Sequence, residues 1–446
     1  MSRRAPGPRG DRLLGHVRPF RRDALGLLVA SHRRYGDVVQ FRLGPTVVHL
    51  LAHPDHIAHV LLERQPNYDK DTRSSRQIRR VTGTGLLTSN GSAWRRHRRL
   101  MQPAFHARRV ASFVEIMSRA TDVMLERWQA AEKRGEVVDV QSAMMRLTCT
   151  IVARALFGAD VTADLDMIEQ AATEVMLAAY RGVERIVPVP SWLPTTPNAR
   201  FRRALADLNT LIERLVDDRQ LRSGHNLISM LAEAKDEDGN AGLSREEICE
   251  EALTLLLAGH ETTANALAWT FALLAEHPDE AASVRAEVAN VLAGRAPAPV
   301  DLRGLSRTGR AIREAIRLYP PIWIMERHVR EDDEVGGFHL PSGSMVVLCP
   351  YVTHRHAAFW SNADRFDPAR FEEPHASQRH DQAYIPFGAG QRLCIGAPFA
   401  MAEAQVIVSM VLQRFLLERV ERTPLVAQPG ITLRIRGGLP MRLRRL

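Results

Sequence analysis

The residue in the most distinctive chemical setting is Cys394, which lies in the glycine-rich segment 387–396, FGAGQRLCIG. Glycines on both sides of the cysteine let the backbone pass close to a flat ligand and leave amides free to donate to the sulfur. The helical run that follows places a positive dipole end near the sulfur, which favours the thiolate. Arg392 is well placed to bind a carboxylate of the same ligand. The segment therefore predicts a thiolate ligand to a metal, and the alternative is a buried cysteine in a glycine-rich turn.

A second group of reactive side chains lies in the middle of a predicted helix over 245–276. Ser244 and Glu247 form a capping-box pattern at its start, and Pro278 follows its end. At 1.5 Å per residue this helix is about 48 Å long, enough to cross the whole molecule. Its centre, 258–263 (AGHETT), combines glycine, ionisable side chains and β-branched alcohols, which are unfavourable in a helix. Such a departure from local rules indicates function, and the alternative is a tolerated polar stripe.

The segment around Cys394 resembles the haem-binding signature of the cytochrome P450 family, Phe-x-x-Gly-x-Arg-x-Cys-x-Gly, with every fixed position filled. The resemblance implies haem b (iron protoporphyrin IX) as cofactor, with the Cys394 sulfur as the iron ligand. A thiolate on iron donates electron density that helps to cleave O–O bonds. The resemblance also implies a mainly α fold with a long central distal helix and small β-sheets. Phe387, Gly388, Arg392 and Gly396 are expected to contact the cofactor.

The centre of the long helix is similar to the oxygen-activating motif on the distal helix of the same family. By this resemblance, Gly259 lets the helix open beside the bound oxygen. Thr262 is expected to donate a hydrogen bond to that oxygen, and Glu261 to relay protons from solvent. These three residues are the expected catalytic set.

Three charged residues are expected to have a structural role. Glu314 and Arg317 resemble the family's Glu-x-x-Arg helix, and 366–371 (FDPARF) resembles the segment whose arginine, here Arg370, completes the network. Spacing of three puts the first two on one helical face, and such a pair alone is more often solvated. The resemblance implies a buried cluster in which loss of one partner costs about 3–5 kcal/mol. The run 307–310 (RTGR) departs from the apolar or aromatic residues common in the family here.

Four residues are expected, by resemblance, to contact the haem propionates. Trp94 and Arg98 are similar to the family's Trp-x-x-x-Arg helix, and Arg327 matches a further propionate arginine. Arg392 completes this set. His97 is either an additional contact or a surface residue. The surrounding arginines are expected to face an acidic electron donor, because complementary charge speeds encounter.

The substrate pocket is sketched from the family's substrate positions, which are mostly apolar in this chain. The residues expected to line it could equally belong to the core. A hydrophobic substrate of small to medium size follows, and the chain resembles actinobacterial terpene or fatty-acyl oxidases. A terpenoid is favoured, with a fatty acid or a macrolide as alternatives. The expected pocket residues are Ala258, Ile322, Trp323, Ile324 and Ile431.

The activity implied by the resemblance is that of a haem-thiolate monooxygenase, which inserts one oxygen atom from O2 into a hydrophobic small molecule. No flavin or iron–sulfur segment follows the cysteine, so separate electron donors are expected. The resemblance implies that these are ferredoxin and ferredoxin reductase. One alternative is a peroxide-driven oxygenase or an isomerase on the same fold, against which Glu261 and Thr262 argue. Another is a non-catalytic haem-binding partner protein, although such family members tend to lose the cysteine or the distal threonine.

The bulk composition fits an ordinary globular protein. Apolar residues make up 45% of the 446 residues and charged residues 25%. No apolar run approaches the roughly 18 residues of a membrane span, and the basic start lacks a signal-peptide core, so a cytoplasmic protein without an anchor is expected. The net charge of +9 comes from dispersed arginines, which favours solvated surface over nucleic-acid binding. Three of the four cysteines, Cys149, Cys249 and Cys349, are expected to be ordinary thiols.

The organisation along the chain predicts a single domain over 1–446. Alternating apolar residues predict a β-hairpin over 36–51, and strand-like pieces return at 334–349 and 431–445. The region 92–290 is mainly helical by its apolar spacing. A proline-rich stretch at 187–197 is expected to be an ordered loop or lid, and the polar 236–240 an exposed turn.

Overall fold

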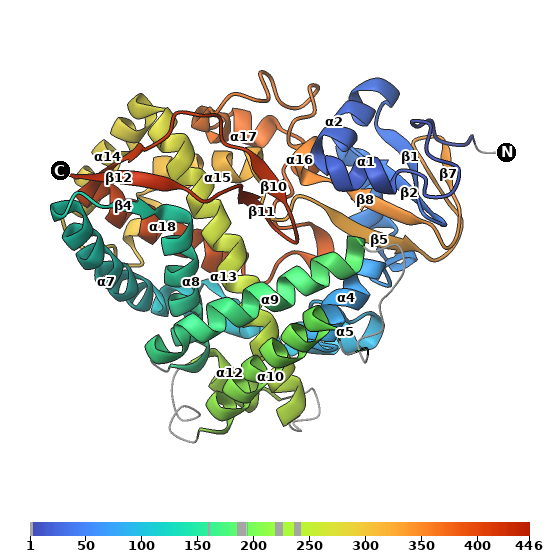
Figure 1. Ribbon diagram of the computed structural model, residues 1–446. Helices are drawn as coiled ribbons and strands as arrows, with labels where there is room; N and C mark the ends of the chain where they lie inside the picture. The colour runs from blue at the N-terminus through green and yellow to red at the C-terminus, as the bar shows by residue number, and fades with distance from the viewer. Residues whose placement is uncertain (1–2, 159–160, 185–192, 194, 219–225, 236–241) are drawn as a thin grey trace.

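Helices make up most of the protein, as the sequence predicted. The computed structural model describes residues 3–158, 161–184, 193, 195–218, 226–235 and 242–446. Figure 1 shows α13 passing through the middle of the molecule, with other helices packed around it. The described α-helices are α1 (Val17–Arg22), α2 (Ala24–Tyr35), α3 (Pro54–Ala58), α4 (Arg73–Thr82), α5 (Gly91–Met101), α6 (Ala107–Ser112), α7 (Val114–Lys133), α8 (Val140–Phe157), α9 (Leu165–Glu184), α10 (Thr196–Asp217), α12 (Leu227–Glu233), α13 (Arg245–Glu276), α14 (Pro278–Leu292), α15 (Ser306–Leu318), α16 (Pro350–Thr353), α17 (His375–Gln378) and α18 (Ala397–Arg414).

The predicted long helix is confirmed as α13. The hydroxyl of Ser244 accepts from the amide of Glu247 (3.2 Å), and the carboxylate of Glu247 accepts from the amide of Ser244 (2.8 Å), so the capping box is complete. The helix ends at Glu276, just before Pro278 begins α14. Apolar side chains face all directions in its second half, and nearly all are buried. A helix of this kind lies inside the core.

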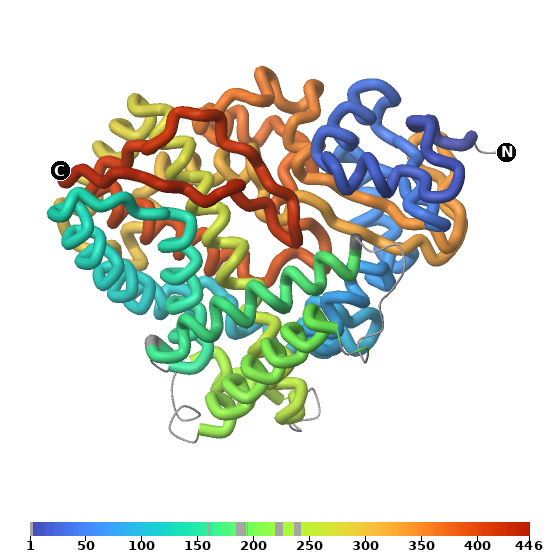
Figure 2. Tube along the Cα trace, in the orientation of Figure 1, coloured from blue at the N-terminus to red at the C-terminus, as the bar shows by residue number. Residues whose placement is uncertain are grey.

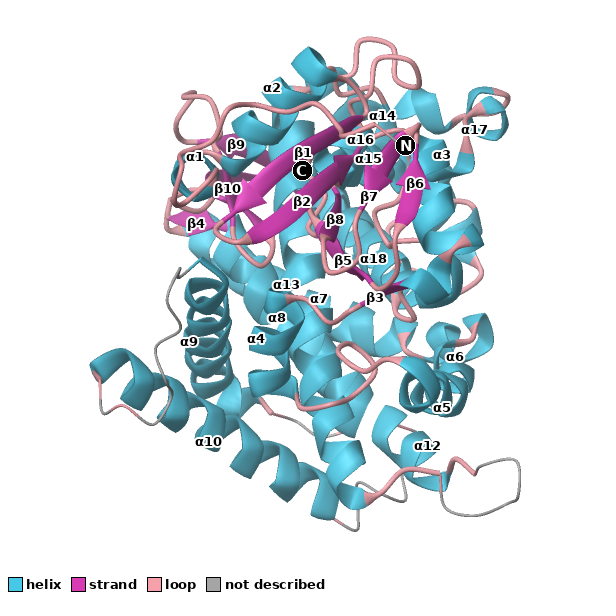
Figure 3. Cartoon of the chain, turned by 90° about the vertical axis from the view of Figure 1, so that its right-hand side faces the viewer, coloured by secondary structure: helices cyan, strands magenta, loops and turns pink. Residues whose placement is uncertain are grey.

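A five-stranded sheet forms the second part of the core. The predicted hairpin is confirmed as β1 and β2, and the strand order is β1-β2-β8-β5-β3. Successive residues of β1 and β8 alternate between two apolar clusters, one on each face of the sheet. Figure 3 shows the strands gathered in one half of the molecule and α9, α10 and α12 in the other. The strands are β1 (Val38–Leu43), β2 (Thr46–Leu51), β3 (Tyr68–Asp69), β4 (Val137–Asp139), β5 (Met325–Val329), β6 (Asp333–Val335), β7 (Phe338–Leu340), β8 (Met345–Leu348), β9 (Phe415–Arg419), β10 (Ala427–Pro429), β11 (Leu433–Ile435) and β12 (Pro440–Arg445).

The C-terminal strands lie against the long helix (Figure 2). The amide of Asn265 on α13 donates to the hydroxyl of Thr432 (3.0 Å), and the indole of Trp269 donates to the carbonyl of Leu433 (3.2 Å). The amide of Leu433 in turn donates to the carbonyl of Pro321 (2.9 Å). The C-terminal region is therefore positioned by α13 and by the segment that precedes β5.

The polar segment 307–310, which departs from the family's usual apolar residues, does not disturb the start of α15. Arg307 pairs with Glu280 on α14 (3.0 Å), and Arg310 pairs with Glu372 (2.9 Å), so both charges are compensated. The predicted loop at 187–197 lies largely outside the described residues, as does the predicted turn at 236–240. Across the described part of the chain, no helix is both long and apolar enough to cross a membrane. A single domain over 1–446 stays a prediction.

Candidate active site

Cys394 lies between a short 3₁₀ turn, η8 (Gly390–Arg392), and the start of α18. Its amide donates to the carbonyl of Phe387 (2.9 Å), which closes the loop. Gly388 and Gly390 have positive φ angles of 75° and 68°, and a side chain on Gly390 would meet the carbonyl of Leu61. These two glycines are thus required by the backbone. Gly396 has no positive φ, and a Cβ there would meet only the Cys394 sulfur, at 4.0 Å.

The thiol of Cys394 is not biased toward the thiolate by the protein alone. Burial raises its pKa, and the amides of Gly396 and Ala397 and the charge of Arg98 offset this only in part. The residue keeps accessible surface, yet its sulfur is surrounded by protein on most sides, and this desolvation dominates. The helix end favours the thiolate as predicted, through the amides of Gly396 and Ala397, but burial has the larger effect on the pKa of Cys394. A bound metal ion reverses this net effect, because coordination deprotonates a thiol.

Three cationic side chains lie near one another and near Cys394, and the hydrogen bonds that they make are to uncharged groups. Lys70 donates to the carbonyl of Leu87 (2.9 Å), and Arg327 donates to the carbonyl of Glu326 (2.7 Å). Arg392 donates through Nη2 to the carbonyl of Ser89 (2.8 Å), while its buried Nη1 has no partner among the residues that the structure describes. Within the described residues, none of these three cations pairs with a carboxylate.

The electrostatics of these three cations favour a negatively charged ligand. Burial lowers the pKa of Lys70 well below its ordinary value, and the charges of Arg327 and Arg392 lower it further. Burial likewise lowers the pKa of Arg327 and of Arg392 to about 10. Like charges gathered in a desolvated place favour an anionic ligand. The donor set of one cysteine and several unpaired cations therefore fits haem, whose propionates would supply the missing negative charge.

The other expected propionate residues support this group in different ways. The guanidinium of Arg392 lies 4.5 Å from the ring centroid of Trp94, a cation–π contact that orients it. Arg98 donates to the carbonyl of Leu393 (2.8 Å), the residue before the cysteine. Sequence reasoning missed Lys70, although it is one of only three lysines in an arginine-rich chain.

His97 is neither a surface residue nor directed at the cations. It is 4% exposed, and its Nδ1 lies 2.6 Å from a carboxylate oxygen of Glu251 on α13. This hydrogen bond, together with the nearby charge of Glu247, raises the pKa of His97. His97 thus connects α5 to α13.

The predicted structural cluster is assembled as expected. Two nitrogens of Arg317 donate to the carboxylate of Glu314 (2.6 and 2.8 Å), and Nε of Arg370 lies 3.3 Å from the same carboxylate. The side chains of Glu314 and Arg317 are fully buried. Arg317 also donates to the carbonyl of His354 (2.7 Å), whose ring accepts from the amide of Ile385 (2.9 Å). The cluster therefore supports the chain that leads to the cysteine loop.

The centre of α13 is a regular helix in this structure. A Cβ on Gly259 would lie 3.0 Å from a methyl group of Val152, so this glycine permits close packing of α8 on α13. The hydroxyl of Thr262 donates to the carbonyl of Ala258 (2.7 Å), one helical turn earlier. The helix continues without a break from 245 to 276, and its opening at Gly259 beside bound oxygen stays a prediction.

Glu261 is held by the C-terminal segment. Its carboxylate accepts from Nε of Arg434 on β11 (2.9 Å) and from the hydroxyl of Thr432. Glu261 is 4% exposed at its side chain, whereas Arg434 is 36% exposed. The pair therefore joins the centre of α13 to the protein surface. Sequence reasoning missed Arg434, because nothing local connects it to α13.

The expected pocket segments lie together, with one correction. Hydrogen bonds tie the segment 430–433 to α13 and to the segment around 321–323. Ala258 is exposed, and Ile322, Ile324 and Ile431 are partly exposed. Trp323 is 2% exposed, packs in the apolar cluster on one face of the five-stranded sheet, and donates to the carbonyl of Gly430 (3.0 Å). Since a pocket-lining ring keeps exposed surface, Trp323 belongs to the core.

The comparisons with known proteins agree with this geometry. The family profile described as Cytochrome P450 matches residues 6–438. The chain is 37% identical over 435 residues to the protein named cyclooctatin synthase of Streptomyces melanosporofaciens, covering 97% of this chain and 94% of that one. It is 34% identical over 407 residues to pentalenene oxygenase of Streptomyces avermitilis, covering 90% and 89%. The crystal structure of the haem domain of cytochrome P450DA matches with a TM-score of 0.91 at 26% identity, covering 100% and 98%.

The chain therefore belongs to the cytochrome P450 family. It is a monooxygenase that contains haem iron, uses O2 and receives electrons from redox partners. The expected family, fold class and activity are all confirmed.

Proposed function

We propose that this monooxygenase inserts one oxygen atom from O2 into a terpenoid. The observation that carries this proposal is the similarity over nearly the whole chain to cyclooctatin synthase and pentalenene oxygenase, whose names refer to terpenoid compounds. The partly exposed Ile322, Ile324 and Ile431 suit an apolar skeleton, and hydrogen bonds tie their segments to each other. A fatty acid and a macrolide remain the competing substrate classes.

We further propose that haem b is the cofactor and that Cys394 is its sulfur ligand. When bound, the haem iron supplies the activation of O2. Lys70, Arg327 and Arg392 would hold the propionates, because their free N–H groups and net positive charge are uncompensated within the described residues. Trp94 would keep the Arg392 guanidinium in place through its ring face. Phe387 and Gly388 would shape the loop that presents the sulfur.

On the other side of the proposed haem site, Thr262 and Glu261 would handle protons. The hydroxyl of Thr262 now donates to the carbonyl of Ala258 and would turn to donate toward the reacting oxygen. Glu261 would pass on protons that reach it from the solvent beside the partly exposed Arg434. Gly259 keeps α13 close to α8, which fixes the position of both side chains.

The electron donor proposed for this chain is a ferredoxin, reduced by a ferredoxin reductase. A hollow of about 510 Å³ reaches Cys394, and its lining includes Arg98, His106 and Arg313. An acidic protein would be attracted to this surface, because opposite charges raise the rate of encounter. Arg95, which lies on α5 together with Arg98, is exposed and adds to the positive charge of this surface. A cytoplasmic location stays a prediction.

The experiment that tests the substrate class is an optical titration of the purified ferric protein with terpenes, fatty acids and macrolides. A terpene that converts the low-spin thiolate spectrum to high-spin supports the proposal, since substrate then displaces water from the iron. A shift with fatty acids alone, or with macrolides alone, contradicts it. The Cys394→Ala variant tests the ligand separately: loss of the thiolate spectrum is expected, and an unchanged spectrum contradicts the assignment.

Turnover then separates a monooxygenase from the peroxide-driven and non-catalytic alternatives. With ferredoxin, ferredoxin reductase and NADPH, product carrying one atom of ¹⁸O from labelled O2 is expected. Product formed only with added peroxide would support the first alternative. NADPH consumption without any oxidised product, for every compound that shifts the spectrum, would support the second.

A further inference from the structure

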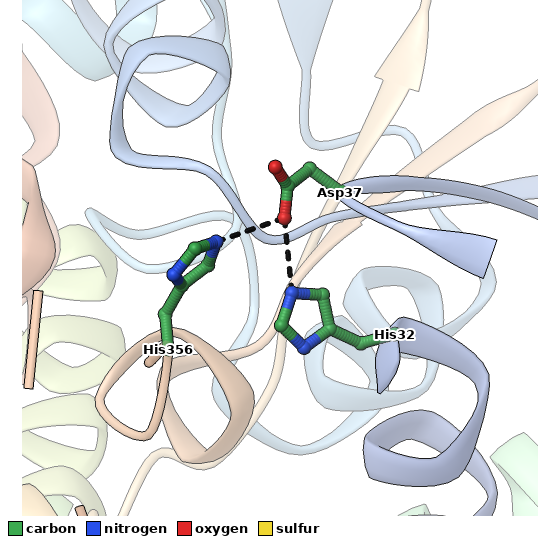
Figure 4. A group of neighbouring side chains, drawn as sticks. All are labelled: His32, Asp37 and His356. Carbon is green, nitrogen blue, oxygen red and sulfur yellow. Dashed lines mark hydrogen bonds and ion pairs between the residues drawn. The ribbon is translucent and has the colours of Figure 1, made fainter. Parts of the chain in front are cut away.

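A group of histidine and carboxylate side chains lies apart from the active site, where α2, the start of β1 and the turn after α16 meet (Figure 4). Nε2 of His32 and Nε2 of His356 each lie 2.9 Å from the same oxygen, Oδ1 of Asp37. All three of these atoms lie within 4.8 Å of one another. The group therefore brings two imidazole nitrogens and one carboxylate oxygen to a common point.

We propose that His32, Asp37 and His356 bind a divalent late first-row transition metal, with Zn²⁺ as the best fit. Two neutral imidazoles and a carboxylate are ligands that Zn²⁺ accepts, whereas Ca²⁺ and Mg²⁺ prefer oxygen alone. Zinc bonds of about 2.0–2.2 Å at tetrahedral angles separate the ligand atoms by roughly 3.3 Å. Each imidazole thus needs to retreat from Asp37 by only about 0.4 Å.

The site is open to solvent on one side. The side chains of His32, Asp37 and His356 are 16%, 33% and 11% exposed, so an ion can enter and keep water as its fourth ligand. An aspartate carboxylate is ionised at neutral pH, the condition of the test below. A negative charge is therefore already present to attract a cation.

The proton balance of binding follows from the present hydrogen bonds. The amide of Ala358 donates to Nδ1 of His356 (3.2 Å), so the proton of neutral His356 is on Nε2 and points to Asp37. When the metal occupies Nε2, that proton moves to Nδ1 and the contact with Ala358 opens. The loss of this contact weakens binding, so we expect a Kd on the order of micromolar rather than the much tighter binding of a preformed zinc site.

Metal binding here would join segments that are distant in the sequence. His32 belongs to α2, which packs on β1 of the five-stranded sheet. His356 follows His354, which receives hydrogen bonds from Arg317 and from the amide of Ile385. The ion would thus fasten the N-terminal region to the chain that supports the cysteine loop. At 100 times Kd, we expect the Tm of this 446-residue protein to rise by about 3 °C.

A neighbouring pair provides a matched control. His380 lies 2.9 Å from Asp55 through Nε2, in the same region of the molecule, and shares no oxygen with the three proposed ligands. The ring of His53 lies 5.8 Å from that of His356 and contacts Asp55 rather than Asp37. His380→Ala therefore removes one histidine–carboxylate contact without removing a ligand.

The test is equilibrium dialysis of tag-free, haem-loaded protein against Zn²⁺ at neutral pH after treatment with a chelator, with elemental analysis and calorimetry. Haem-loaded protein keeps Cys394 from competing for zinc. We expect one zinc ion per chain, besides the haem iron, in the wild type and in His380→Ala. We expect at least tenfold weaker zinc binding in His32→Ala, Asp37→Asn and His356→Ala. Ca²⁺ at the same concentration should not bind.

Two results would overturn the assignment. One is the absence of additional zinc in wild-type protein at 100 µM, a concentration about two orders of magnitude above a micromolar Kd. The other is zinc binding in His32→Ala that equals the wild type, which would place the ion elsewhere. If His356→Ala fails to fold, His32→Ala decides the question, because His32 lies near the C-terminal end of α2 and is partly exposed.

Discussion

Two groups of charged residues near the cysteine loop, one buried and one partly buried, have opposite composition. In the first, Arg317 and Arg370 surround the carboxylate of Glu314, and their remaining donors reach backbone carbonyls. In the second, Lys70 and Arg392 converge with Arg327, and in the described part of the chain no carboxylate pairs with any of them. Both groups are desolvated, yet only the first is complete.

This difference separates a structural cluster from a ligand site. A buried charge is costly unless it is paired, so a complete set can hold the fold together by itself. An incomplete set of like charges instead lowers the stability of the empty chain and gains its partner from outside. The proposed haem propionates have the right charge for this, which is why the second group is assigned to the cofactor.

The largest expected effect comes from removing the one carboxylate of the complete group. Glu314→Gln leaves Arg317 buried and uncompensated, so we expect the free energy of unfolding to fall by about 3–5 kcal/mol. Urea unfolding measures it. The control is Glu115→Gln, whose partner Arg119 is 75% exposed and which should cost under about 0.5 kcal/mol. Equal losses of free energy of unfolding in the two variants would contradict the structural role of the Glu314 cluster.

The next effect tests the incomplete group. Lys70→Met removes a desolvated cation from among like charges, so the haem-free chain should be as stable as the wild type or more stable. Haem retention should weaken by about 1.5–3 kcal/mol, roughly 10- to 150-fold, because a charged hydrogen bond to a propionate is lost. Haem transfer to an apoprotein acceptor measures it, with the exposed Lys133→Met as control. A destabilised haem-free chain with unchanged haem retention would make Lys70 structural.

A smaller effect is expected at Glu261, whose partner is only partly buried. Arg434→Leu should lower the free energy of unfolding by about 1 kcal/mol, since solvent screens the 36% exposed guanidinium. Turnover should fall more than stability, because the proposed proton path passes this pair. The ratio of product formed to NADPH consumed measures this. A variant with normal turnover and coupling would exclude Arg434 from the path.

The smallest effect is a dependence on pH at His97. The hydrogen bond to Glu251 raises the pKa of His97 above its ordinary 6.5, so the protonated form stabilises the fold. This contribution is complete below pH 6.5 and is lost as pH rises through the raised pKa. The stability difference between wild type and His97→Gln should therefore be larger at pH 6 than at pH 9, by about 1 kcal/mol. Chemical unfolding at both values checks it, and an equal difference at the two pH values would contradict it.

The sequence alone was enough to identify the elements that depend on nearby residues. The cap formed by Ser244 and Glu247 and the hairpin over 36–51 were both predicted correctly. The partners Glu314 and Arg317 lie one helical turn apart, so the spacing predicted their pairing, whereas only the family resemblance implied their burial. In each case the responsible interactions span only a few residues, so the local pattern encodes them.

Tertiary structure decided what depends on distant segments. It brings Lys70 to Arg392, joins Glu261 to Arg434, and turns Trp323 into the core instead of the pocket. It also raises the pKa of the Cys394 thiol, since burial is a property of the whole fold. No local pattern specifies which distant side chain meets a given one, because pairing and desolvation are set by how all the segments pack together.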